Sequence, residues 1–209
     1  MGVRSYWRWL PAALVVLPVL GALAESKEGV WIDATLYDGF HVILPEDASP
    51  MRKHAAELFF EFWKKAASVP ITMSPRNEGK INVWIGKEQL TRDIFDVGRL
   101  DDLDPEGYAV RTYTPIPRYK EQGAARQLII AGATDRGTLN GVYGFFHEVF
   151  GWRWLAPGVT FTPYANYTIT KMDTMVSPAF WYREMDARGV CTDAAFDEAH
   201  HFARPYVAP

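Results

Sequence analysis

The sequence predicts an α+β domain, in which two main helices pack on one face of a mixed β-sheet. Three observations lead to this fold class. Residues 50–67 and 138–150 carry apolar side chains at helical spacing. About six short segments around them have the apolar patterns of strands. The chain has 209 residues, 48% of them apolar and 22% charged, which is the composition of a globular protein.

The N-terminal part predicts two strands and a helix. Residues 30–32 and 40–44 are the expected strands, and Tyr37-Asp38-Gly39 is the expected turn between them. The helix is expected to begin at Pro50, because Ser49 is a favourable N-cap and proline is favoured at the first helical position. Its predicted buried stripe is Ala55, Leu58, Phe59, Phe62 and Ala66. Its predicted solvated face is Arg52, Lys53, Glu57, Glu61, Lys64 and Lys65.

The middle of the chain continues as alternating strands and helices. Strands are expected at residues 69–73, 80–86, 108–113 and 127–131, and a short helix at 90–97. The second main helix is expected at 138–150, with Thr134 or Asp135 capping its start and Gly151 ending it. Further strands are expected at 152–155 and 167–171.

Three glycines fall in or beside the second helix, at positions 137, 141 and 144. Glycine inside a helix costs about 1 kcal/mol relative to alanine. We therefore expect these positions to bring the helix backbone close to the sheet.

The first 24 residues have the layout of a secretory signal peptide. Arg4 and Arg8 form a basic region, residues 10–20 are apolar apart from two prolines, and Ala22-Leu23-Ala24 is a cleavage site. The apolar run is too short for a membrane span, which needs about 20 residues. Cleavage removes two arginines and no acidic residue, so the formal net charge falls from −3 to −5. The expected location is secreted or periplasmic, in a bacterium, with no membrane attachment after cleavage.

Composition excludes several classes of site. The net charge gives no basic surface for nucleic acid. The single cysteine, Cys191, excludes an internal disulfide and a thiolate zinc cluster. The acidic loop at Asp101, Asp102 and Asp104 lacks the spacing of a calcium-binding EF-hand. No metal and no cofactor is expected.

The catalytic motifs in the chain are incomplete. His147-Glu148 begins like the H-E-x-x-H zinc helix, but Gly151 stands where the second histidine belongs. The 132–137 loop lies between a strand and a helix, but Thr138 stands where a phosphate loop needs lysine. His200 and His201 are adjacent, so on a helix they would not face the same way. No catalytic residue is assigned.

One long stretch resembles a known family. Residues 133–146 (ATDRGTLNGVYGFF) and 151–157 (GWRWLAP) resemble the α-glucuronidase N-terminal domain family, and are similar to the small domain that precedes the barrel in β-hexosaminidases. Residues 38–45, the first helix and residues 177–184 (SPAFWYRE) fit the same pattern. After this junction Glu184-Met185-Asp186-Ala187 replaces the Asn-His-Trp-Asp of α-glucuronidases, which favours a related group of uncharacterised secreted bacterial proteins.

The resemblance implies a non-catalytic domain of a glycoside hydrolase active in polysaccharide breakdown, including that of xylan glucuronate side chains. It implies a signal peptide at 1–24, an α+β domain at 25–175, and the start of a truncated (β/α)8 barrel at 176–209. The catalytic carboxylates would lie in the barrel, so this chain alone is expected to be inactive, and carbohydrate would be bound through the missing barrel.

Arg183 and Glu184 are the candidate substrate-binding residues. Arg183 occupies the position of an arginine that contacts the sugar in β-hexosaminidases, while Glu184 replaces the glycine that follows it. A guanidinium there could donate paired hydrogen bonds to a sugar. The alternative is a structural arginine paired with Glu184 or Asp186.

Two other functions remain open on the sequence. A stand-alone carbohydrate-binding module would use exposed aromatic faces to stack on sugar rings, and its candidates are Trp152, Trp154, Trp181 and Tyr182. A metal-dependent hydrolase would use the histidines. If a barrel is missing, Phe180 and Trp181 are expected to lie on an exposed apolar surface.

Overall fold

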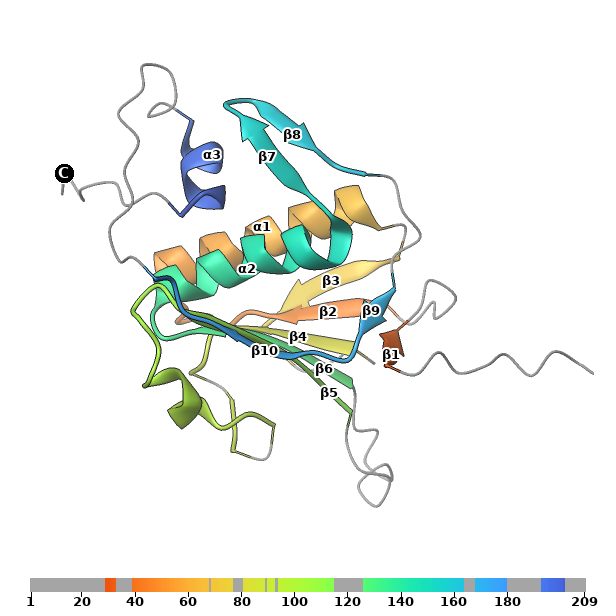
Figure 1. The fold of residues 1–209 in the computed structure, drawn as a ribbon. Helices are drawn as coiled ribbons and strands as arrows, with labels where there is room; N and C mark the ends of the chain where they lie inside the picture. Colours follow the sequence, from red (N-terminus) through yellow and green to blue (C-terminus); the bar gives the residue numbers. More distant parts are fainter. Residues whose placement is uncertain are drawn as a thin grey trace, which may run out of the picture.

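The computed structural model confirms the predicted fold class, with both main helices side by side on one face of a six-stranded mixed sheet (Figure 1). The structure describes residues 29–32, 39–67, 69–76, 81–88, 90–92, 94–114, 126–163, 168–179 and 193–201. The predicted signal peptide lies outside these residues. None of the helices in the described part is long and apolar enough to cross a membrane.

The central sheet is parallel in one half and antiparallel in the other. Its strand order is β10 (Asp173–Val176), β5 (Tyr108–Tyr113), β6 (Arg126–Gly132), β4 (Ile81–Ile85), β2 (Phe40–Ile43) and β3 (Ile71–Ser74). Strands β3, β2, β4 and β6 run parallel, and β5 and β10 each run antiparallel to their neighbour. The carboxyl ends of β2, β4 and β6 therefore meet at one edge, where both helices begin.

Both helices begin and end close to the predicted positions. Helix α1 (Pro50–Ala66) has Ser49 as its N-cap, whose hydroxyl accepts from the Arg52 amide at 3.2 Å. Helix α2 (Asp135–Phe150) is capped by Thr134, whose hydroxyl accepts from the Gly137 amide at 3.2 Å. Gly151 ends α2 in the left-handed conformation, with φ 68°. The capping predictions are confirmed.

The expected close approach of α2 to the sheet is also confirmed. A Cβ atom on Gly137 would collide with the carbonyl oxygen of Gly107. One on Gly144 would collide with the phenol of Tyr108, on β5. Glycine at these positions lets the helix backbone lie directly on β5 and on the turn before it.

An aromatic cluster packs between and around the two helices, from Phe40 on the sheet side to Trp154 on the opposite side. Phe62 of α1 lies at the centre, with ring centroids 5.2 Å from Phe146, 5.0 Å from Trp152 and 5.9 Å from Trp154. The cluster is completed by Phe40, Phe59, Trp63, Tyr143, Phe145 and Phe150. The high aromatic content of the sequence thus serves a buried core.

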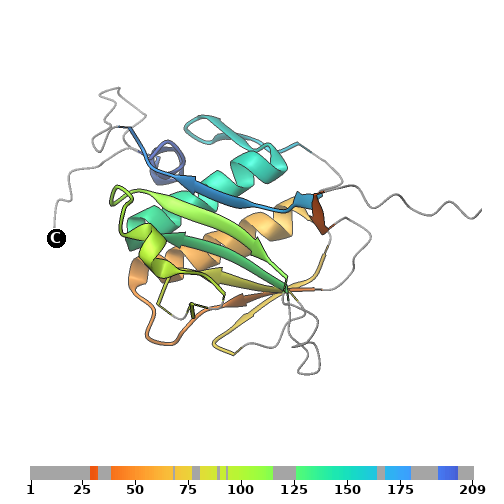
Figure 2. The same cartoon turned by 60° about the horizontal axis from the view of Figure 1, so that its bottom comes forward.

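The opposite face of the sheet is partly covered by the chain between β4 and β5. Figure 2 shows this segment in front of the sheet, with the helices behind it. Phe95 and Leu100 pack there on Ala109, Ile129 and Ala131. The helix predicted at 90–97 is wrong, because the described residues of this segment form isolated turns and then a single 3-10 turn, η1 (Val97–Leu100).

Three features of the connections differ from the predictions. Strand β1 (Val30–Ile32) pairs antiparallel with β9 (Ile169–Thr170) and does not form a hairpin with β2. Strand β7 (Arg153–Ala156) pairs with β8 (Val159–Phe161), a strand that was not predicted, in a separate hairpin. Strand β10 and helix α3 (Ala194–Ala199) were not predicted either.

The β7–β8 hairpin lies above the helix layer beside α3 (Figure 1). Its inner side chain Trp154 is buried, while Leu155, Val159 and Phe161 are more than half exposed. Helix α3 packs on α2 and on β7. The helix layer is therefore enclosed between the sheet on one side and these elements on the other.

Candidate functional site

The predicted substrate-binding residues Arg183 and Glu184 lie outside the described residues, as do Phe180, Trp181 and Tyr182. Cys191 lies outside them as well. Their predicted roles therefore stay predictions.

Trp152 and Trp154 are core residues, which corrects the expectation that they could stack on a sugar. Trp152 is 2% exposed and Trp154 is 9% exposed. The two side chains do point to the same side, with ring centroids 6.0 Å apart, but that side faces the aromatic cluster. Both rings pack against aromatic side chains of α1 and α2, so neither is open to a ligand from solution.

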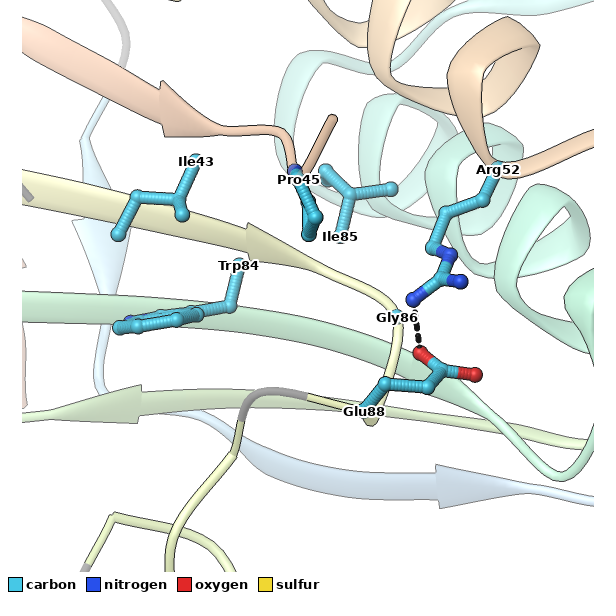
Figure 3. Close-up of a pocket in the computed structure, with 7 residues that line it drawn as sticks. All are labelled: Ile43, Pro45, Arg52, Trp84, Ile85, Gly86 and Glu88. Atoms are coloured by element: carbon cyan, nitrogen blue, oxygen red, sulfur yellow. Dashed lines mark hydrogen bonds and ion pairs between the residues drawn. The ribbon is translucent and has the colours of Figure 1, made fainter. Parts of the chain in front are cut away.

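An ion pair between Arg52 and Glu88 marks the carboxyl edge of the parallel strands (Figure 3). Arg52 was predicted on the solvated face of α1 but is only 8% exposed. The first turn of α1 lies over the end of β4. The side chain of Arg52 therefore extends across that edge of the sheet and not into water. Gly86 permits this, because its φ is +104° and a Cβ there would collide with Cδ of Arg52.

A small cavity beside this ion pair lies where open α/β sheets commonly bind ligands. It is lined by Ile43, Pro45, Arg52, Trp84, Ile85, Gly86 and Glu88. Its volume is about 10 Å³, which is room for about one water molecule. The indole of Trp84 is held in place by a 2.6 Å hydrogen bond that it donates to Gln127. This arrangement closes the sheet edge and cannot admit a sugar ring.

The N-termini of both helices are satisfied by the chain itself. The Ser49 hydroxyl donates to the Asp135 carboxylate, which joins α1 to α2. The Lys87 ammonium donates to the Ala133 carbonyl at 2.7 Å, and the Gly132 amide donates to the Thr138 hydroxyl at 3.0 Å. A carboxylate in the first turn of α2 occupies the position that would favour a phosphate. The interpretation of residues 132–137 as a capped strand-to-helix turn is confirmed.

A second polar cluster joins α1, α2 and α3 around Glu198. The phenol of Tyr143 donates to Oε2 of Glu198 at 3.0 Å, and Nε2 of His54 lies 3.1 Å from the same oxygen. Burial raises the pKa of Tyr143, and the negative charge of Glu198 raises it further. Tyr143 therefore stays a protonated donor, and Glu198 is an acceptor with two partners rather than a free base.

The other chemical motifs are separate surface features. Nδ1 of His147 lies 2.8 Å from Oε1 of Glu148, and the His147 side chain is half-buried while that of Glu148 is mostly exposed. Asp104 accepts from the Glu106 amide at 3.2 Å within the acidic loop. Within the described ranges, no group of three or more histidine, cysteine, aspartate or glutamate residues could hold a metal ion.

Glycoside hydrolysis needs two carboxylates about 5–10 Å apart on either side of the scissile bond. Three of the described carboxylates are engaged by other side chains: Glu88 by Arg52, Asp135 by Ser49, and Glu198 by His54 and Tyr143. These groups stabilise contacts between helices, strands and loops. The clusters were not predicted, because their members are 36, 86 and 144 residues apart in sequence.

No protein-family model matches the chain, and no curated protein matches it in sequence. Among solved structures, 42 chains match. The chain is similar to a family GH115 4-O-methyl-α-glucuronidase with specificity for decorated arabinogalactans, at 18% identity and a TM-score of 0.48, over 69% of this chain and 18% of that one.

The chain is also similar to two β-hexosaminidases. The first is an N-acetyl-β-hexosaminidase of Streptomyces plicatus, at 13% identity and a TM-score of 0.41, over 70% of this chain and 23% of that one. The second is a GH20 β-N-acetylhexosaminidase of Streptomyces coelicolor A3(2), at 13% identity and a TM-score of 0.41, over 69% of this chain and 23% of that one. All three of these proteins are glycoside hydrolases, and the chain spans less than a quarter of the length of each.

Proposed function

We propose that this chain is the non-catalytic N-terminal α+β domain of an exported bacterial glycoside hydrolase that acts in polysaccharide breakdown. In this proposal residues 1–24 direct export, residues 25–175 form the domain, and residues 176–209 lead into a (β/α)8 barrel. The barrel supplies the catalytic carboxylates at the carboxyl ends of its strands. Its substrate is a polysaccharide such as xylan with glucuronate side chains.

The observation that carries the proposal is that the residues responsible for the family resemblance build the fold. Thr134 caps α2, and Gly137 and Gly144 bring α2 against the turn at Gly107 and against Tyr108. Trp152 and Trp154 complete the aromatic cluster. Because these residues cap a helix and pack the core, they support a structural role for the domain. In this proposal the hydrolytic residues lie in the barrel.

The first experiment reads the coding sequence beyond codon 209 in all three frames. An open frame that encodes several hundred residues with alternating strand and helix patterns is the expected result. A stop codon followed by unrelated sequence would overturn the assignment as the first domain of a hydrolase.

The second experiment uses the chain from residue 25 to residue 209. We expect no hydrolysis of xylan or of aryl glycosides, and no change in tryptophan fluorescence or heat on titration with xylo-oligosaccharides. Saturable binding by this chain would instead favour the stand-alone carbohydrate-binding module. It would require aromatic faces other than Trp152 and Trp154.

The proposed roles of Arg183 and Glu184 are tested in the longer form. Arg183→Ala and Glu184→Gln are expected to raise KM for the substrate and to leave the thermal midpoint of this domain unchanged. Arg153→Ala is the matched control, because its guanidinium donates to the carbonyls of His147 and Trp152 within the fold. If Arg183→Ala lowers stability and leaves KM unchanged, Arg183 is the structural arginine.

A further inference from the structure

The β7–β8 hairpin carries an exposed group of apolar side chains. In the described part of the chain, the large apolar side chains that lie in water are Leu155, at 64% exposed, Val159, at 52%, and Phe161, at 53%. All three belong to this one hairpin. Single exposed apolar residues are ordinary on a protein surface, but a group gathered on one element marks a surface that binds a partner.

The hairpin is held so that this face points away from the helix layer. Trp154 packs inward on Phe62, with ring centroids 5.9 Å apart. Leu155 follows it where the register with β8 shifts, and successive side chains of a strand point to opposite faces. The turn is tied down as well, because the Gly158 amide donates to the Asp193 carboxylate at 2.6 Å. The apolar face is therefore a fixed surface.

The same face can be covered without burying an unpaired charge. Arg153 is the one charged residue of the two strands. Its guanidinium donates to the carbonyls of His147 and Trp152, at 2.9 and 2.7 Å. A partner that covers Leu155 and Phe161 thus leaves this group with hydrogen-bond partners, which avoids the large cost of an isolated buried charge.

The size of the surface indicates what kind of partner it fits. Three side chains that are about half exposed offer a few hundred Å². A stable interface between separate proteins buries about 800 Å² on each partner. Interfaces between domains of one chain bury about 600–1,500 Å² in total, so a few hundred Å² on each side is enough for them. The surface therefore fits a domain of the same chain better than a second copy or a separate protein.

The end of the described chain lies beside this surface. Helix α3 packs on β7 and α2, on the side of the helix layer away from the sheet (Figure 1). Asp193, its N-cap, makes the contact to the hairpin turn. A domain joined to α3 by a short linker would be present at an effective concentration in the millimolar range, so a small apolar surface suffices to hold it.

We infer that the outer face of the β7–β8 hairpin is the docking surface for the barrel that follows this domain. The inference rests on the proposed function, which supplies the barrel. Helices form the outer ring of such a barrel, so the fitting surface is an apolar stripe on one or two of these helices. Docking covers Leu155, Val159 and Phe161 and extends the contact that α3 already makes with the hairpin.

The test compares maleimide labelling of Val159→Cys in the longer form and in the chain of residues 25–209, both with Cys191→Ser. We expect labelling to be about tenfold slower or more in the longer form, because a covered thiol does not meet the reagent. Leu155→Ser and Phe161→Ser together should restore fast labelling in the longer form and leave the shorter chain unchanged. Asp102→Cys is the matched control, since Asp102 is exposed between η1 and β5, and it should label equally in both forms.

Equal labelling of Val159→Cys in the two forms refutes the docking surface and leaves the proposed function intact. Protection that the two serine substitutions do not relieve refutes it as well. Slow labelling of the shorter chain that depends on protein concentration assigns the surface to a second copy and also refutes the inference. If no reading frame follows codon 209, the proposed function fails and the inference fails with it, on the coding sequence and not on labelling.

Discussion

Ser49, the N-cap of α1, donates a hydrogen bond to Asp135, the first residue of α2. The same hydroxyl accepts from the Arg52 amide at 3.2 Å. One side chain therefore caps one helix and ties it to the start of the other, beside the ends of β2 and β6.

Replacing Ser49 by alanine is expected to lower the free energy of unfolding by about 1–2 kcal/mol, since the cap and the link to Asp135 are both lost. Ser49→Asn can accept from the Arg52 amide and donate to Asp135, so its stability should stay close to that of the wild type. Ser49→Asp keeps the cap but places two carboxylates together. Urea denaturation of the three variants checks this, and equal stability of Ser49→Ala and wild type would contradict it.

Gly137→Ala is expected to destabilise the protein by about 2–3 kcal/mol. The added methyl collides with the backbone carbonyl of Gly107, which cannot move away as a flexible side chain can. The better helix propensity of alanine offsets only about 1 kcal/mol of this cost. Gly98→Ala is the control, because Gly98 lies on an exposed turn and a Cβ there would be 3.3 Å from its nearest neighbour, Oδ1 of Asp96. Its free energy of unfolding should stay within about 0.5 kcal/mol of the wild-type value.

Trp152→Ala is expected to lower stability by about 3–5 kcal/mol, because it empties a buried site between Phe62 and Phe146. The neighbouring change Leu155→Ala removes a side chain that is 64% exposed and should cost less than about 0.5 kcal/mol. Thermal or urea unfolding gives both values. A stable Trp152→Ala variant would show that this ring is not required by the core.

The raised pKa of Tyr143 predicts a loss of stability in alkali. The folded state holds this proton more strongly than the unfolded chain, whose tyrosines ionise near pH 10. The stabilisation is complete below pH 10 and declines as pH rises above it, since the unfolded state then gains by releasing the proton. Tyr143→Phe should show a shallower decline above pH 10.

Tyr108 contributes in the same direction, because burial and then the charge of Glu148 raise its pKa. The decline in Tyr143→Phe should therefore be reduced and not abolished. Absorbance of tyrosinate in the folded protein gives an independent measurement. If Tyr143→Phe leaves the alkaline slope unchanged, the phenol is not held in its protonated form by the fold.

Local signals in the sequence predicted most of the helix layer. Ser49-Pro50 and Thr134 mark helix starts, and Gly151 marks an end, because caps depend on residues within one turn. The strands at 108–113 and 81–85 follow from alternation of apolar side chains. The glycines of α2 predicted a close approach, and the structure supplied its partners, Gly107 and Tyr108.

Contacts between distant parts of the chain could not be predicted in this way. The pairing of β1 with β9 joins Val30 to Thr170, and nothing in either segment specifies the other. Arg52 fits the charged face of an ideal helix, and only the position of α1 over the end of β4 explains its burial. The Glu198 cluster likewise depends on three helices that are far apart in sequence.

The pairing of β1 with β9 also sets an order of events during synthesis. A chain is made from its N-terminus, and domains generally fold as units once their parts are available. Val30 is among the first described residues to emerge, but its partner Thr170 is among the last. Strand β1 therefore stays unpaired until nearly the whole domain has been synthesised. In a ribosome-stalled chain that ends before residue 169, β1 should be cleaved readily by a protease.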